Sequence, residues 1–282
     1  MKLMFEDILI HDTAAMTLRA LANKPPQSLL LIGPSGVGKT TMAEAWARNI
    51  ATQPSGVRIV EPDEKGSISI DAVRELYRAG RSKQAGRQVI VILDIDTMSI
   101  EAENAFLKLL EEPREGLIFV LTAASTEAIL PTILSRVQTV TVSVLTDETI
   151  RRFIVEQKPG IADSDLAQLV FIAQGRPGIA ASLLEGDALD KQRVRMQTVK
   201  QLLTASLFER FVFINSLARD RQACLEDLSA MLRIVEVQVK NASDQGKISH
   251  WLQLANTLEA TLQAIQANGN MRAQLLRLFS SY

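Results

Sequence analysis

Short runs of apolar residues recur along the first half of the chain and alternate with amphipathic segments. These apolar runs, some of which include a polar residue at one end, occupy 28–32, 57–60, 89–94, 117–122 and 140–142. Because successive positions in the central runs are apolar, we predict strands that are buried on both faces. Apolar residues at helical spacing occupy the segments 13–23, 39–51, 70–81 and 102–110. This alternation indicates an α/β fold, in which helices cover both faces of a parallel sheet.

The pattern changes after Val144, where the strand signal stops and helical spacing continues to the end of the chain. Short helices are predicted at 146–156, 163–173 and 177–184. Longer helices are predicted at 190–205, 207–218, 222–242, 248–267 and 271–280. The change of pattern and the turn at residues 185–187 predict three domains. They are an α/β domain over 1–144, a small helical domain over 145–187 and an all-α domain over 188–282.

A glycine-rich turn follows the first apolar run and leads into a helical segment. It matches the phosphate-binding pattern G-x-x-x-x-G-K-[ST], and its residues are Gly33, Pro34, Ser35, Gly36, Val37, Gly38, Lys39 and Thr40. Glycines let backbone N–H groups converge on an anion, and the next helix directs its positive end at the phosphates. Lys39 has the length to reach the outer phosphates, and the Thr40 hydroxyl is a ligand for Mg²⁺. We expect the chain to bind ATP with Mg²⁺; the alternative is a purely structural glycine-rich turn.

A P-loop ATPase also needs a carboxylate on a second strand to hold Mg²⁺. Asp94, which closes the third apolar run, is the candidate, and the alternative is an aspartate that caps a loop. Many such ATPases carry a water-polarising glutamate at the next position, which is Ile95 here, and isoleucine neither accepts a proton nor orients water. Asp96 lies one position too far along, so a turn residue is the favoured interpretation. The sequence therefore predicts weak hydrolysis.

Composition and charge narrow the class of protein. The chain carries 31 Lys and Arg against 32 Asp and Glu, and the net charge of −1 shows no global attraction to nucleic acid. Cys224 is the only cysteine, which excludes disulfides within the chain and a cysteine-based zinc site. No apolar stretch reaches the ~20 residues of a membrane span. The first residues lack the apolar core of a signal peptide, so we expect a soluble, cytoplasmic protein without a membrane partner.

Two smaller features have plain structural interpretations. A basic run consists of Arg74, Arg78, Arg81, Lys83 and Arg87. A solvated face is favoured for it over contact with DNA or another subunit. Trp46, on the helix that follows the glycine-rich turn, is expected in the core.

Two blocks downstream of the glycine-rich turn resemble motifs of a known family. Residues 104–113 read N-A-F-L-K-L-L-E-E-P, and residues 130–136 read L-P-T-I-L-S-R. These blocks are similar to those of the AAA+ clamp-loader family, in which N-A-L-L-K-x-L-E-E-P precedes the fourth strand and L-P-T-I-x-S-R-C follows it. Further similarity lies at residues 60–62, 68–76, 175–180 and 268–272. The resemblance covers most of residues 1–185, and beyond that it rests on helical character and length.

The resemblance implies an AAA+ ATPase domain over 1–144, a helical lid over 145–187 and a helical collar over 188–282. Family members assemble through the collar into a hetero-pentamer of clamp-loader subunits that opens the sliding clamp and places it on primed DNA. By this resemblance, residues 33–40 bind the nucleotide and Asp94 holds Mg²⁺. Arg136 acts in trans, on the γ-phosphate bound by a neighbouring subunit. The alternative is that Arg136 pairs with an acidic residue of its own chain.

The sequence also departs from the family pattern. The cysteines that hold zinc in many relatives are missing, so no zinc is expected. The polar sensor of the fourth strand falls on residues 122–124, where Thr122 is a weak candidate. The lid arginine of active motor subunits falls on Gly178, and Arg176 is displaced from that position. Together with Ile95, these departures imply a subunit that holds nucleotide but mainly supplies architecture and its trans-acting arginine.

Whether the chain is itself an enzyme is therefore left open by its sequence. One alternative is a motor-type clamp-loader ATPase, in which Asp96 or the geometry of a water molecule compensates for Ile95. Another is an AAA+ ATPase outside replication, against which the two motif blocks argue.

Overall fold

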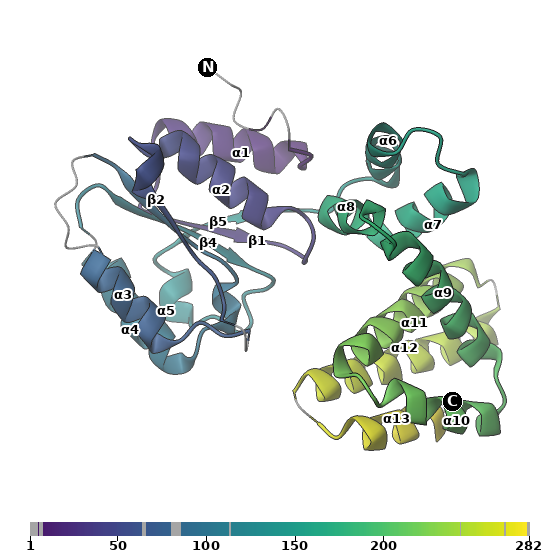
Figure 1. Cartoon of the computed structure of the whole chain (residues 1–282). Helices are drawn as coiled ribbons and strands as arrows, with labels where there is room; N and C mark the ends of the chain where they lie inside the picture. Colours follow the sequence, from purple (N-terminus) through teal and green to yellow (C-terminus); the bar gives the residue numbers. More distant parts are fainter. Residues whose placement is uncertain are drawn as a thin grey trace. The chain divides into compact units, whose positions relative to one another are not determined.

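The computed structural model describes residue 5 and residues 8–63, 66–79, 86–112, 114–242, 244–267 and 269–280, with backbone alone at 77–79, 240 and 241. The chain divides into two compact units, Met1–Ser182 and Leu183–Tyr282. We describe each by itself (Figure 1). Within the described residues, no helix combines the length and the apolar character that a membrane crossing requires.

The first unit is built on a parallel sheet. Its strands, among the described residues, are β1 (Ser28–Ile32), β2 (Val57–Val60), β3 (Gln88–Ile92), β4 (Leu117–Ala123) and β5 (Gln138–Thr141). Their order across the sheet is β2-β3-β4-β1-β5, and every described pairing is parallel. The predicted strands are thus confirmed, with ends that shift by one or two residues. The carboxyl ends of all five strands lie at one edge.

Helices cover both faces of the sheet, as Figure 1 shows. One face carries α1 (Asp12–Asn23) and α2 (Lys39–Ile50), and the other carries α3 (Ile70–Ala79) and α4 (Ile100–Glu111). Side chains alternate along each strand, so Leu29 and Leu31 join the core under α1 and α2, while Leu30 joins the core under α3 and α4. The α/β fold with a doubly covered parallel sheet is confirmed.

Single contacts fix the helices on the sheet. Trp46 is fully buried, and its Nε1 donates a hydrogen bond to the carbonyl oxygen of Leu18 at 2.8 Å, which ties α2 to α1. The expectation that Trp46 belongs to the core is confirmed. On the opposite face the rings of Phe106 and Phe119 meet edge to face, with centroids 5.2 Å apart.

Short helices complete the first unit. The 3₁₀ helices η1 (Pro54–Gly56) and η2 (Ile95–Thr97) and the helix α5 (Pro131–Leu134) lie in its loops. After β5 come α6 (Asp147–Gln157), α7 (Asp163–Ala173) and α8 (Pro177–Leu184), close to the predicted short helices. These helices fall in the same compact unit as the sheet up to Ser182. A separate domain over 145–187 stays a prediction.

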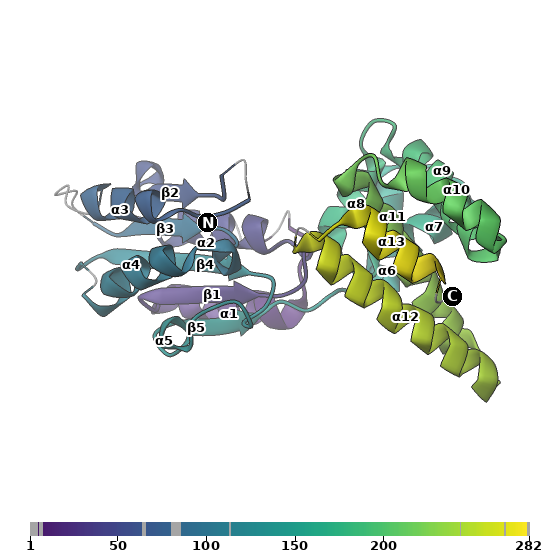
Figure 2. The same cartoon turned by 90° about the horizontal axis from the view of Figure 1, so that it is seen from below.

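The second unit is helical throughout its described residues. It contains α9 (Ala188–Thr204), α10 (Leu207–Leu217), α11 (Arg221–Asn241), α12 (Gln245–Gln266) and α13 (Met271–Ser280). These match the predicted helices to within three residues at every end. Figure 2 shows α12 and α13 side by side. Leu228, Leu258 and Phe279 are among the side chains that form its buried interior.

Candidate nucleotide site

The glycine-rich turn joins β1 to α2 at the carboxyl edge of the sheet, as its motif predicts. Gly38 caps α2 with φ of +93°, a left-handed conformation that glycine adopts without strain. Gly33 lies against the backbone that follows β5, so closely that a Cβ on Gly33 would stand 2.2 Å from the carbonyl oxygen of Val142. Backbone N–H groups at the start of α2 are therefore available to an anion, because the first turn of a helix leaves them without intrahelical partners.

Lys39 is held inside the loop rather than extended into solvent. Its side chain is buried, with the residue 7% exposed, and Nζ donates to the carbonyl oxygens of Gly33 at 2.7 Å and Pro34 at 3.1 Å. Burial lowers the pKa of Lys39, while the carboxylates of Asp94 and Asp96 act in the opposite direction. The ammonium group thus lies near two acidic side chains at one end of the sheet.

Asp94 lies two residues after β3, where it caps η2 in a left-handed conformation with φ of +49°. Its backbone N–H donates to Oγ1 of Thr122 at 2.9 Å, and the same hydroxyl donates to Asp94 Oδ1 at 3.5 Å. Thr122, the weak sensor candidate, is fully buried and serves as a partner of Asp94. Strand β4 therefore fixes the carboxylate that the sequence assigned to Mg²⁺.

The two residues after Asp94 point to different surroundings. Ile95 is 1% exposed and packs in the core on the α3 and α4 side of the sheet. Asp96 accepts a hydrogen bond at Oδ2 from the backbone N–H of Ala124 at 2.9 Å. Its other oxygen, Oδ1, is buried and has no hydrogen-bond partner among the described residues. From the sequence, a turn residue is the favoured interpretation of Asp96. Local spacing does not reveal what surrounds a side chain, so the buried oxygen could not be predicted.

The oxygen atoms of the side chains at this edge of the sheet are of the kind that a magnesium nucleotide needs. Mg²⁺ prefers hard oxygen ligands and is usually held by one or two carboxylates together with phosphate oxygens. The Thr40 hydroxyl, the Asp94 carboxylate and the orphaned Asp96 oxygen are ligands of that kind. In the part of the chain that the structure describes, no three His, Cys, Asp or Glu side chains form a metal cluster. A bound Mg²⁺ would therefore depend on the phosphates as well as on the protein.

The start of α8 directly contacts the glycine-rich turn of residues 33–40, called the phosphate loop below after its motif. The backbone N–H of Gly178 donates to the carbonyl oxygen of Gly36 at 2.8 Å, and a Cβ on Gly178 would stand 3.0 Å from that oxygen. The side chain of Ile179 packs against Gly36. Arg176 has turned away, since its Nε donates to the carbonyl oxygen of Ala173 at 3.0 Å. At Gly178, the position that the resemblance assigns to the lid arginine, the contact with the glycine-rich turn is therefore made by a backbone N–H.

Arg136 lies just after α5, on the surface of the first unit. The buried Glu103 accepts the N–H of Leu130 at 3.0 Å and so fixes the start of α5. The Arg136 side chain is 38% exposed; Nη2 lies 3.0 Å from Oε1 of Glu111, and Nη1 donates to the carbonyl oxygen of Thr132 at 2.9 Å. The alternative in which Arg136 pairs within its own chain is therefore realised in this structure. Exposed pairs of this kind contribute only ~0–1 kcal/mol, so another anion can displace Glu111.

Other predicted features are placed only in part. In the basic run, Arg74 pairs with Asp71 at 3.1 Å, and Nη1 of Arg87 donates to the carbonyl oxygen of Ile50 at 3.1 Å. Arg81, Lys83 and the side chain of Arg78 lie outside the described residues, as do Pro113 and Asn268 of the motif blocks. The solvated face favoured for this run stays a prediction, with contact to DNA or another subunit as its alternative.

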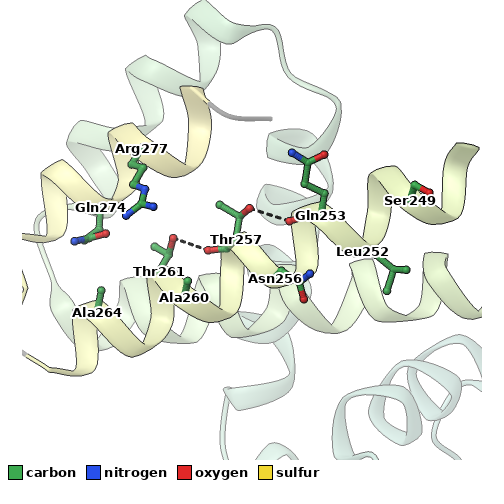
Figure 3. Close-up of a pocket in the computed structure, with 10 residues that line it drawn as sticks. All are labelled: Ser249, Leu252, Gln253, Asn256, Thr257, Ala260, Thr261, Ala264, Gln274 and Arg277. Carbon is green, nitrogen blue, oxygen red and sulfur yellow. Dashed lines mark hydrogen bonds between the residues drawn. The ribbon is translucent and has the colours of Figure 1, made fainter.

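The second unit holds a groove between α12 and α13, drawn in Figure 3. Its volume is about 590 Å³, and its lining includes Gln253, Thr257, Thr261 and Arg277. The Thr257 and Thr261 hydroxyls donate to carbonyl oxygens one turn earlier, at 2.8 and 2.7 Å (Figure 3). Arg277 is the one ionisable side chain among the lining residues. The lining residues thus offer hydroxyl and amide groups and a single positive charge.

The strand order, the phosphate loop between β1 and α2 and the carboxylate after β3 define an AAA+ type of P-loop fold. A solved structure supports this fold: a DNA polymerase III gamma subunit-related protein of Thermotoga maritima matches with a TM-score of 0.59. Identity is 20%, and the match covers 94% of this chain and 97% of that one.

Sequence comparisons narrow the class. The family model for "DNA polymerase III, delta subunit" matches residues 48–146. DNA polymerase III subunit delta' of Pseudomonas aeruginosa is 27% identical over 62% of this chain and 60% of its own length. DNA polymerase III subunit gamma/tau of Mycobacterium tuberculosis is 30% identical over 58% of this chain, which spans only 33% of that relative. The matches support a delta-prime-like member of the clamp-loader family of DNA replication, as the motif blocks predicted.

Proposed function

We propose that the chain is a clamp-loader subunit that binds ATP with Mg²⁺ and hydrolyses it weakly or not at all. The observation that carries this proposal is an intact phosphate loop beside a buried isoleucine. Lys39 lies near Asp94 and Asp96, which supports binding of a magnesium nucleotide. Ile95 is enclosed in the core, and Gly178 has no side chain that could contact a phosphate. The chain thus holds the groups for binding and lacks those that activate water.

Calorimetry and steady-state turnover of the isolated chain test this proposal. We expect measurable binding of ATP with Mg²⁺, and a turnover reduced by the ~10²–10⁴-fold that general acid–base catalysis usually contributes. Turnover on the order of 1 s⁻¹ or more, within the ordinary range of enzymes, would contradict the weak ATPase and favour the motor-type alternative. Failure to bind ATP would instead show that the loop is a structural turn.

We further propose that the chain assembles with related subunits into a hetero-pentamer that places the sliding clamp on primed DNA. The printed names of its relatives support this role, because they are subunits of DNA polymerase III. Contact with DNA would be made through the assembly, in the cytoplasm. Residues 188–282 are proposed as the collar, the main surface of association.

An apolar patch on α10 supports the collar as an association surface. Leu207, Phe208 and Val212 are 51%, 78% and 59% exposed, and they lie close together along one helix. Phe208→Asp should weaken assembly with clamp-loader subunits, measured as the mass of the complex that forms on mixing. Val194→Asp, at an exposed apolar residue of α9, is the matched control. Equal assembly of both variants and the wild type would contradict a role for the α10 patch.

Arg136 is proposed to act in trans on nucleotide bound by a neighbouring subunit. Its exposed guanidinium and the weakness of its pair with Glu111 support this role. A donated arginine accelerates phosphoryl transfer by ~10³–10⁵, and lysine lacks the planar fork that binds two oxygens. Arg136→Ala should therefore lower ATP hydrolysis by the assembled complex and leave nucleotide binding by this subunit intact. Arg48→Ala, which removes an exposed arginine paired with Glu44 at 2.6 Å, is the control. Full activity of the Arg136→Ala complex would rule the trans role out.

A further inference from the structure

The turn after β3 brings two carboxylates to the same end of the sheet. It is a short 3₁₀ helix over Ile95–Thr97, held by hydrogen bonds from the Thr97 N–H at 2.9 Å and the Thr97 hydroxyl at 2.7 Å to the carbonyl oxygen of Asp94. This turn directs Ile95 into the core, and it leaves Asp94 and Asp96 both near enough to Lys39 to attract its charge. Asp96, rather than residue 95, is therefore the second acid beside the phosphate loop.

The carboxylate of Asp96 is only half satisfied. Oδ2 accepts the N–H of Ala124, whereas Oδ1 is buried without a partner among the described residues. The ammonium group of Lys39 donates to two loop carbonyls, and no hydrogen bond from it reaches Asp96 Oδ1. A buried anionic oxygen without a partner is costly, and each such atom in a folded protein calls for an explanation. A cation that arrives with a ligand is one such explanation.

We propose that Asp96 helps to hold the Mg²⁺ of a bound nucleoside triphosphate, as a second carboxylate beside Asp94. This inference rests on the proposed function, because the phosphates would complete the ligand set. Mg²⁺ usually keeps several waters, so Asp96 would act either on the ion or on one of its waters. In this role Asp96 is a positioning residue that strengthens binding, and it does not make the site hydrolytic.

A purely structural role for Asp96 is the competing explanation. In that case the side chain only fastens the β3 turn to the backbone after β4, through the N–H of Ala124. Asp96→Asn separates the two roles, because the amide oxygen still accepts that N–H while the negative charge is lost. Asp63→Asn is a matched control, since Asp63 Oδ1 also accepts a backbone N–H, that of Ser67 at 3.1 Å, after β2.

The test is calorimetric binding of ATP to the full chain, once with excess Mg²⁺ and once with EDTA. For Asp96→Asn we expect affinity to fall by ~10-fold or more with Mg²⁺, the lower end of what loss of a metal-orienting partner causes. With EDTA we expect affinity to stay equal or to rise, because one negative charge near the phosphates is gone. Asp63→Asn should match the wild type in both conditions.

Each other outcome has a definite meaning. Equal affinity of Asp96→Asn and the wild type with Mg²⁺, or an equal loss with and without Mg²⁺, would overturn the role of Asp96 and leave the proposed function standing. Failure of the wild type to bind ATP in either condition would overturn the proposed function and this inference with it.

Discussion

The two units of this chain use their polar groups in different ways. In the first, polar side chains from distant segments gather at the carboxyl edge of one sheet, where Lys39, Asp94, Asp96 and Thr122 meet. In the second, the described ion pairs lie along one helix or between neighbouring helices, as where Arg195 contacts Glu226 at 2.6 Å and Asp227 at 2.8 Å. A parallel sheet collects strand ends and helix starts at one edge, whereas packed helices spread polar groups along their lengths. The first architecture favours a ligand site, and the second favours surface recognition.

The largest expected effect concerns Cys224, the only cysteine and a buried residue of the second unit. Burial, with a smaller contribution from Asp227, raises the pKa of Cys224 to about 11 from 9.0. At pH 8 a thiol with this pKa holds about 100-fold less thiolate than one with the ordinary value of 9.0, the value expected in the unfolded chain. Alkylation by iodoacetamide, followed by mass spectrometry, should be slower by at least that factor in the native protein than in denaturant. Equal rates would show that this helical core is open.

The next prediction concerns the proposed nucleotide site of the first unit. Lys39→Ala removes a buried ammonium group that bonds the loop carbonyls. Charged hydrogen bonds contribute ~1.5–3 kcal/mol each, so ATP affinity measured by calorimetry should fall by ~10–100-fold. Lys200→Ala, on an exposed face of α9, is the control and should bind ATP like the wild type. Unchanged affinity of Lys39→Ala would separate the loop from nucleotide binding.

The same substitution can be compared in the two units, because each has a glycine at the second position of a helix. Gly178 and Gly246 are both the second residue of a helix. Gly178→Ala should destabilise the protein by ~1 kcal/mol or more, because its Cβ would crowd the Gly36 carbonyl oxygen at 3.0 Å. Gly246→Ala has room, with its nearest contact at 3.7 Å, and should be neutral or stabilise by up to ~1 kcal/mol. Urea unfolding measures both; the same sign for both would refute the close approach of α8 to the loop.

The smallest effect is expected at the pair that holds Arg136. Glu111→Gln removes a half-exposed ion pair and should cost ~0.2–1 kcal/mol of unfolding free energy, less at high salt. Glu112→Gln changes the neighbouring exposed carboxylate and should cost nothing measurable. A loss above ~2 kcal/mol for Glu111→Gln would mean that the pair fixes Arg136 and is not readily exchanged for another anion.

Local patterns account for the elements that the sequence predicted well. The strands, the helices and the glycine-rich turn follow from side-chain spacing and glycine placement, which act over a few residues. The buried position of Trp46 follows in the same way, because it lies on the inner face of an amphipathic helix. The family likewise follows from short motif blocks that are specific in themselves.

By itself, then, the sequence determined the α/β character, the helical second half and the place of the glycine-rich turn between β1 and α2. Tertiary structure alone decided that Asp96 lies near Lys39, that the N–H of Gly178 bonds the Gly36 carbonyl and that Arg136 pairs with Glu111. Each of these contacts joins segments far apart in the chain, and each depends on how loops meet at the edges of the packed elements. Local propensity carries no information about such contacts, because the residues that make them come together only after the sheet has formed.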